Sequence, residues 1–285
     1  MAKVLATDLD GTLLYPSKFF RLASKKNIRF LRKWIDAGNK LVVVSSRGPE
    51  FMKRLKEEVE RDFDFISYTS SYIVANNEVI RDVSIPGEEM SVILNKIEHK
   101  YHPLAYLMDL EGQPILVKNL NVGARILIFF YTLYWFFQGK KREPYILSNK
   151  VFDEKLKGGK VYKVMVFFGL AKSKSEISKE INKELREQFK DVESSWTSVV
   201  NELTPPNCNK GEGLKYYCDY LKINHDDVYV VGDSGNDISM LNLFHENSYC
   251  MAHAYPSVKK YAAHTISRVH KLDKLVLNKG EKNHE

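Results

Sequence analysis

The chain has 285 residues, enough for about two domains of ordinary size. Hydrophobic residues make up 44% of it and charged residues 28%, a composition that excludes collagen-like, low-complexity and wholly disordered proteins. The 43 basic and 36 acidic side chains give a net charge of +7. The basic excess is spread along the chain and forms no tail, so we expect a small anionic ligand and no nucleic acid as partner.

The three cysteines, Cys208, Cys218 and Cys250, form no CxxC motif and have no histidine at zinc-ligand spacing. The N-terminal sequence MAKVLATDLD contains carboxylates where a secretory signal has an apolar run. We therefore expect a protein of a reducing, cytoplasmic compartment.

Apolar runs alternate with amphipathic patterns in the first part of the chain. Residues 4–10 and 40–46 are typical of buried strands. Between them, residues 24–37 carry apolar side chains at helical spacing, with Ser24 as a candidate N-cap and Gly38 beyond the end. A helical period resumes after the second strand, so the order is strand, helix, strand, helix.

The same alternation returns near the other end, with helices expected at 214–221 and 238–241 and strands at 228–233 and 248–254. Parallel strands covered by helices define an α/β fold. We predict a Rossmann-like parallel sheet with helices on both faces, which binds its ligands at the carboxyl ends of the strands.

This core is assigned to residues 1–84 and 201–285, and residues 85–200 are interpreted as an inserted α+β domain. The clearest patterns in the insert are a strand at 161–170 (VYKVMVFFGL), a helix at 177–189 and a strand at 196–203 (WTSVVNEL).

An aromatic run, ILIFFYTLYWFF, occupies residues 126–137 of the insert and is followed by Lys140, Lys141 and Arg142. A membrane-spanning helix needs about 20 apolar residues, so this run is too short for one. We interpret it as a packed element without stable membrane insertion; contact with a membrane surface is the alternative.

Two polar loops follow the first two predicted strands. Asp8 and Asp10, in DLDGT, repel each other unless a proton or a metal ion offsets their charges. The alternative is that the segment is only a polar strand end, or a turn that uses Gly11 and Thr12. In SSR, residues 45–47, hydroxyls, backbone N–H groups and a guanidinium suit a tetrahedral oxyanion. A serine at a helix start is also a common cap.

Two further loops lie in the last third of the chain. Lys210 precedes an amphipathic helix, where a lysine is usually solvated. GDSGND supplies Asp233 and Asp237 directly after a strand. Because these ligands are oxygens, without a histidine or cysteine cluster, Mg²⁺ is favoured over Zn²⁺.

In this order, DLDGT, SSR, Lys210 and GDSGND resemble the four motifs of the haloacid dehalogenase (HAD) superfamily of phosphotransferases. The insert resembles the C2 cap of the Cof-type, class IIB phosphatases of that superfamily. Many relatives have TGR where this chain has SSR. The resemblance implies a Mg²⁺-dependent phosphatase that hydrolyses small phosphorylated metabolites, such as sugar phosphates, through an aspartyl-phosphate.

The resemblance also implies a role for each site residue. Asp8 would be the nucleophile and Asp10 the general acid and base. Mg²⁺ would be held by Asp8, the backbone carbonyl of Asp10, Asp233 and Asp237, the last either directly or through water. Phosphoryl oxygens would be bound or approached by Ser45, Ser46, Lys210, Asn236 and Arg47, and Thr12 would orient the first loop.

Two other functions are compatible with parts of this pattern. A phosphomutase shares the nucleophile and the metal but returns the phosphoryl group to its substrate, and it would depend on a bisphosphate activator. A non-enzymatic protein that binds phosphorylated metabolites or a membrane surface would have no need of both Asp8 and Asp10.

Overall fold

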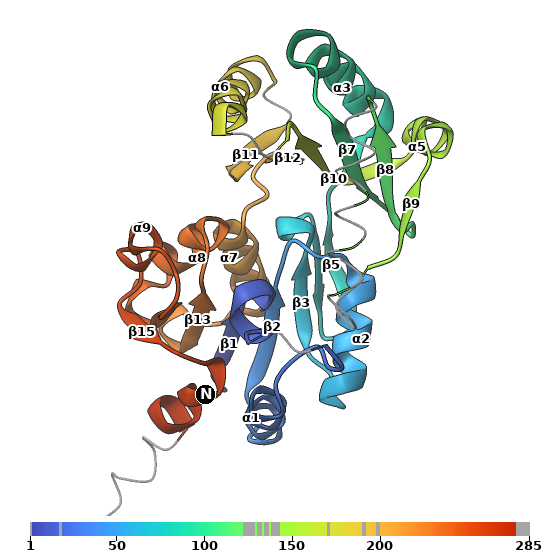
Figure 1. Cartoon of the computed structure of the whole chain (residues 1–285). Helices are drawn as coiled ribbons and strands as arrows, with labels where there is room; N and C mark the ends of the chain where they lie inside the picture. The colour runs from blue at the N-terminus through green and yellow to red at the C-terminus, as the bar shows by residue number, and fades with distance from the viewer. Residues whose placement is uncertain are drawn as a thin grey trace, which may run out of the picture. The chain divides into compact units, whose positions relative to one another are not determined.

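The chain forms two compact units. The first consists of Met1–Arg81 and Asn209–Glu285, and the second of Asp82–Cys208. The structure is a computed structural model (Figure 1), and it describes residues 2–16, 19–121, 129, 133, 137, 143–169, 172–189, 192–197 and 200–277.

The first unit is built on an eight-stranded sheet. Its strands are β1 (Val4–Thr7), β2 (Lys40–Val44), β3 (Asp64–Ser67), β4 (Tyr72–Ala75), β5 (Glu78–Asp82), β13 (Val228–Gly232), β14 (Ser248–Met251) and β15 (His264–Ile266). They lie in the order β15-β14-β13-β1-β2-β3-β4-β5. From β15 to β3 all neighbours are parallel, and β4 runs antiparallel to β3.

Alternate residues of the central strands face two separate apolar cores. Leu5 and Val43 belong to the core that contains side chains of α1 and α2, whereas Ala6 and Val42 belong to the core with α7 and α8. The helices are α1 (Lys25–Asp36), α2 (Pro49–Val59), α7 (Lys210–Leu221), α8 (Ile238–Leu243) and α9 (Pro256–Lys259). Because both faces of the sheet are covered at its centre, the central strands β1 and β2 are almost entirely apolar. The predicted Rossmann-like α/β core is confirmed.

Helix α1 shows how local sequence sets these elements. Its N-cap is Ser24, whose hydroxyl accepts a hydrogen bond from the backbone N–H of Asn27 at 3.2 Å. Beyond its end the chain turns at Gly38, where φ is +80°. The fully buried Trp34 donates from its indole to the carbonyl of Lys40 at 2.8 Å and so fixes the start of β2 to the helix. The predicted helix and its N-cap are confirmed.

The second unit is an α+β structure of its own. Its elements are β6 (Ile85–Pro86), α3 (Gly87–Tyr101), β7 (Ala105–Leu110), β8 (Ile115–Asn119), β9 (Tyr145–Leu147), α5 (Asn149–Leu156), β10 (Lys160–Phe167), α6 (Lys172–Gln188), β11 (Glu193–Thr197) and β12 (Val200–Thr204). The strand order is β11-β12-β10-β7-β8-β9, with β6 paired to β10. Side chains of α3, α5 and α6 share one apolar core with the sheet.

The single strand expected at 196–203 is wrong, because the segment contributes to two antiparallel strands, β11 and β12, in which Thr197 pairs with Val200. An apolar pattern alone does not reveal such a reversal.

The aromatic run at 126–137 lies outside the described residues except for Phe129, Leu133 and Phe137, which are exposed. The basic residues at 140–142 also lie outside the described residues. Among the helices that the structure describes, none has the length and apolar character required to span a bilayer.

Candidate active site

Three neighbouring strands bring the polar loops together. β13, β1 and β2 are adjacent and parallel, so their carboxyl ends lie on one edge of the sheet. Asp233, Asp8 and Ser45 are the residues that directly follow them. The backbone N–H of Asp8 donates to the carbonyl of Val231 at 2.9 Å, which extends the pairing of β1 and β13 as far as the nucleophile candidate. This edge is where ligands bind in open α/β sheets.

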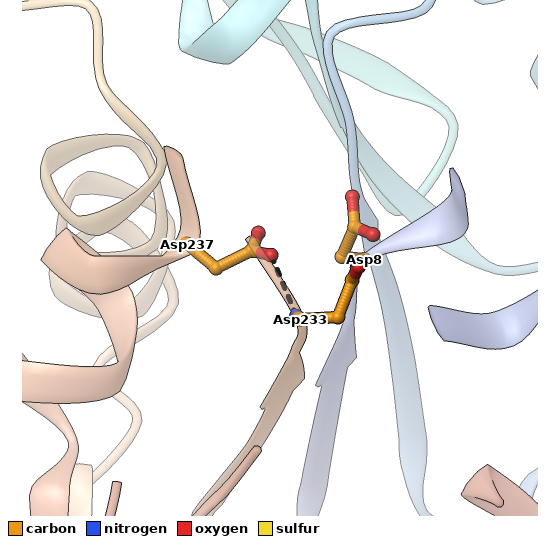
Figure 2. A group of neighbouring side chains, drawn as sticks. All are labelled: Asp8, Asp233 and Asp237. Carbon is orange, nitrogen blue, oxygen red and sulfur yellow. Dashed lines mark hydrogen bonds between the residues drawn. The ribbon is translucent and has the colours of Figure 1, made fainter. Parts of the chain in front are cut away.

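Three carboxylates meet at this edge. Asp8, Asp233 and Asp237 each offer an oxygen within 4.8 Å of the others (Figure 2). Asp8 and Asp237 are buried, and Oδ2 of Asp8 is fully shielded with no hydrogen-bond partner in the described part of the chain. A buried, orphaned carboxylate oxygen within an all-oxygen donor set fits a hard dication such as Mg²⁺.

Lys210, the first residue of α7, supplies the cation of this cluster. Its ammonium lies 2.6 Å from Oδ1 of Asp8 and 2.6 Å from Oδ1 of Asp237, and the side chain is 1% exposed. Burial lowers the pKa of Lys210, but the carboxylates of Asp237 and Asp8 more than offset it, so that its pKa is raised. The lysine is therefore charged at neutral pH. A lysine at the start of a helix is usually solvated, but Lys210 is buried.

The two carboxyls nearest the strand ends are harder to ionise than usual. Burial raises the pKa of Asp8 well above its ordinary value; Lys210 opposes this effect, and the charges of Asp237 and Asp233 add to it. Burial also raises the pKa of Asp233, against a hydrogen bond from Thr12 that lowers it. One lysine does not compensate three carboxylates, so a bound cation would stabilise their ionised forms.

The two oxygens of Asp237 have different partners. Oδ1 faces Lys210, whereas Oδ2 accepts hydrogen bonds from the backbone N–H groups of Asp233 and Ser234, each at 2.9 Å (Figure 2). A side chain at Gly232 would overlap the Asp237 carboxylate, which explains the glycine at this position. Asp237 therefore holds the loop that presents Asp233.

The turn after Asp8 is shaped by Gly11 and Thr12. Gly11 has φ of +83°, and a Cβ atom there would overlap the carboxylate of Asp233. The hydroxyl of Thr12 donates to Oδ1 of Asp233 at 2.8 Å. The DLDGT loop and the GDSGND loop thus touch directly, 221 residues apart in the chain.

Asp10 has a different partner from the other carboxylates. The guanidinium of Arg47 donates to it twice, from Nε to Oδ2 at 2.6 Å and from Nη2 to Oδ1 at 2.9 Å. The guanidinium carbon of Arg47 lies 4.2 Å from the ring centre of Phe51, a cation–π contact that helps to fix the position of the arginine. Asp10 is 52% exposed, as a group that exchanges protons with substrate and water requires. Arg47, expected to reach the phosphate or its neighbours, lies beside the general acid candidate.

The remaining predicted residues lie on the same loops. Ser45 is buried, and its hydroxyl accepts from the backbone N–H of Arg47 at 3.1 Å, while Ser46 is partly exposed. Asn236 is partly exposed and accepts a hydrogen bond from the Ser234 hydroxyl at 2.7 Å. The predicted site residues therefore lie at the carboxyl edge of this sheet, on its loops or, for Lys210, at the start of α7 in contact with Asp8 and Asp237.

Sequence reasoning missed His253. Its Nε2 lies 3.7 Å from Oδ2 of Asp233, and its ring packs at an inclination of 37° against that of Tyr15, with 4.1 Å between centroids. A signal was present, because His253 follows β14, and residues just beyond a parallel strand share the edge on which Asp8 and Asp233 lie.

Comparison with known proteins agrees with this geometry. The family model described as haloacid dehalogenase-like hydrolase matches residues 5–273. The putative phosphatase YkrA of Bacillus subtilis (strain 168) is 22% identical over 262 residues, covering 92% of this chain and 90% of that protein. The 5-amino-6-(5-phospho-D-ribitylamino)uracil phosphatase YwtE of the same organism is 25% identical over 257 residues, covering 85% of each.

Solved structures share the fold along the whole chain. SMU.1108c from Streptococcus mutans UA159 superposes with a TM-score of 0.74 at 22% identity, covering 97% of this chain and 99% of that one. The HAD subclass IIB sugar phosphatase BT4131 gives a TM-score of 0.69 at 21% identity, covering 96% and 98%.

The fold and the matching family model place the chain among the haloacid dehalogenase-like hydrolases. The chain belongs to this family. The curated relatives named above are phosphatases, and the chain shares its fold with the subclass IIB sugar phosphatase BT4131. The resemblance noted in the sequence is confirmed.

Proposed function

We propose that this protein is a Mg²⁺-dependent phosphatase that hydrolyses small phosphate monoesters, including sugar phosphates, through an aspartyl-phosphate. The observation that carries the proposal is the state of Asp8. One of its oxygens is held by Lys210, and the other is buried without a partner in the described residues, beside Asp233. A structural carboxylate would have both oxygens satisfied.

In the first step an oxygen of Asp8 attacks phosphorus while the bond from phosphorus to the substrate alcohol breaks. Asp10 gives its proton to the departing alkoxide. In the second step Asp10 takes a proton from water, the water oxygen attacks phosphorus, and Asp8 leaves as a carboxylate. The two contacts from Arg47 favour the ionised form of Asp10, which takes the proton from water in the second step. For the first step Asp10 must carry a proton, which requires at least one of these contacts to open.

Phosphoryl oxygens are bound by Lys210, the Ser45 hydroxyl and the backbone N–H of Ser46, with Asn236 at the edge of the site. Mg²⁺ would be held by Asp8, the backbone carbonyl of Asp10 and Asp233, with Asp237 behind them through the loop that it anchors. When bound, the ion supplies positive charge that offsets repulsion between the carboxylate and the phosphate.

The second unit is proposed as the cap that selects the substrate, corresponding to the insert expected at 85–200. It has its own sheet and its own apolar core, as a domain inserted between two halves of a catalytic unit needs. The names of YwtE and BT4131, a uracil-derivative phosphatase and a sugar phosphatase, support a small organic phosphate as substrate. A cytoplasmic location is also proposed, since the three cysteines are buried and no disulfide joins them.

The test is phosphate release from a panel of metabolite phosphates and p-nitrophenyl phosphate, with and without Mg²⁺. We expect activity that requires the metal and is lost in Asp8→Asn, whereas Asp219→Asn, at an exposed site on α7, retains it. Acid quenching during turnover should trap a hydroxylamine-labile phosphate on the peptide that contains Asp8. A folded, metal-bound protein that releases no phosphate would refute the proposal, and dependence on a bisphosphate activator would indicate a phosphomutase instead.

A further inference from the structure

Apart from the carboxylate cluster, the first unit contains a group of basic side chains that line a cavity of about 520 Å³. Its lining includes Lys25 and Lys26 at the start of α1, and Arg268, His270 and Lys271 after β15. Two serines and a proline complete it, and no carboxylate is among the described residues that line it. Its volume falls in the range of about 300–1,000 Å³ that is typical of small-molecule sites.

The lysines of this cavity differ from their neighbours on the same helix. Lys33 pairs with Asp273 at 2.6 Å and Arg32 pairs with Glu60 at 2.9 Å. Lys25, Lys26 and Lys271 have no carboxylate within ion-pair distance in the ranges that the structure covers. The charges of these lysines are therefore not neutralised by a paired carboxylate of the described residues, and a bound anion would neutralise them.

His270 reports how closely these charges are gathered. Burial lowers the pKa of its imidazole, and the charges of Lys26, Arg268 and Lys271 lower it further. Three cations from two separate segments therefore act on one ring. Their mutual repulsion is a cost to the folded protein that a bound anion would remove.

The cavity is tied to the catalytic loop through a buried asparagine. Asn27 is fully buried and donates from Nδ2 to the carbonyl of Leu13 at 2.7 Å, in the turn that follows Asp8. Its Oδ1 accepts the backbone N–H of His270 at 3.2 Å and lies 2.8 Å from Nδ1 of the same residue. The wall of the cavity and the DLDGT loop are thus fixed to one side chain.

A second connection runs through aromatic rings. The guanidinium of Arg268 lies 4.5 Å from the ring centre of Tyr15, and the tilted rings of Tyr15 and His253 lie 4.1 Å apart between centroids. His253 in turn approaches Asp233 at 3.7 Å. Only two side chains separate an arginine of the cavity from a carboxylate of the proposed metal site.

We propose that this cavity is a second anion-binding site, that it takes a small metabolite carrying a diphosphate group, and that its occupant acts on the catalytic edge through Arg268, Tyr15 and His253. Four cations from two segments suit two linked phosphates better than one. Binding at the cavity stands by itself, whereas its effect on catalysis rests on the proposed function.

Binding is tested by calorimetry with methylenediphosphonate, whose P–C–P linkage resists hydrolysis, in buffer freed of metal by a chelating resin. We expect the charge-reversal variant Lys26→Glu/Lys271→Glu to bind at least about tenfold more weakly than the wild type. The control Lys215→Glu/Lys260→Glu, which changes net charge equally at other exposed sites, should stay within about twofold. Equal affinities in all three proteins, or equal losses in both variants, would overturn the site.

Coupling is tested by the NMR signal of the His253 ring, assigned by its loss in His253→Gln. The signal should move as methylenediphosphonate is added to the wild type and stay in place in Tyr15→Leu, while calorimetry shows that this variant still binds. A signal that is unmoved in the wild type, or that moves equally in Tyr15→Leu, would overturn the connection. Absence of phosphatase activity alongside binding would refute the proposed function and leave the cavity site standing.

Discussion

Replacing Lys210 by methionine tests the charge arrangement of the site without assuming any reaction. The side chain is 1% exposed and its ammonium bonds to Asp8 and Asp237 at 2.6 Å each. Methionine fills a similar volume but leaves both buried carboxylates without their cation. Removing one partner of a buried ion pair costs about 3–5 kcal/mol, a large part of the ~5–15 kcal/mol that holds a domain together.

The measurement is urea unfolding near neutral pH in metal-free buffer. The raised pKa of Lys210 means that its stabilising contribution is complete below its unfolded-state pKa and is lost only as pH rises through the folded-state value, so neutral pH reports all of it. Lys210→Met should lose about 3 kcal/mol or more. The control Lys215→Met, exposed on the same helix, should change by less than about 0.5 kcal/mol.

A second substitution sharpens the test through its sign. Asp237→Asn should destabilise the wild type, because Lys210 loses one of its two partners. In the Lys210→Met background the same change should stabilise, because it removes a buried charge that no longer has a counter-ion. A deficit below about 1 kcal/mol for Lys210→Met, or the same sign for Asp237→Asn in both backgrounds, would refute this account of the cluster.

Three further predictions concern the loops around Asp8. Gly11→Ala should abolish phosphate release, because its Cβ would overlap Asp233, and it should cost more stability than Gly38→Ala, where φ is also positive but the space is open; equal losses would contradict this. Thr12→Val should weaken Mg²⁺ binding about tenfold, whereas Thr12→Ser should not, as measured by calorimetry; unchanged affinity in the valine variant would exclude an orienting role. Because burial raises the pKa of Asp8, its proton leaves only above the usual range for an aspartate, so Mg²⁺ affinity should continue to rise with pH beyond that range. This rise should be smaller in Asp8→Asn, and an equal slope in both proteins would assign the proton to another group.

Local patterns were sufficient for the elements that position the site. Buried strands that end at Asp8 and Asp233, and a helix capped by Ser24, depend on interactions between near neighbours in sequence. Strands at the edges were harder to predict. β3 and β4 are joined by a segment in which Tyr68 and Thr69 both have positive φ. The segment contains no glycine, so its sequence does not indicate a turn.

The partners of long side chains could not be predicted at all. DLDGT and SSR indicate that Asp10 and Arg47 lie on neighbouring loops, but the two-point contact between them depends on rotamers that Phe51 helps to select from the next turn of chain. The lack of a hydrogen-bond partner for Oδ2 of Asp8 among the described residues likewise results from packing. Lys210 donates to Oδ1, and burial shields Oδ2 from solvent. Residue types predict the chemistry of such a site, and only coordinates show which group meets which.

The charges of the site favour a dication independently of any relative. Asp8, Asp233 and Asp237 carry three negative charges when ionised and Lys210 carries one positive charge, so the buried cluster has a formal charge of −2. Asp10 and Arg47 neutralise each other and leave this balance unchanged. A monovalent ion would leave the cluster one charge short, whereas Mg²⁺ completes it, and a phosphate dianion then meets a neutral site rather than a repulsive one. Burial is the main cause of the raised pKa of Asp8, and the charges of Asp237 and Asp233 add to it against the opposing effect of Lys210.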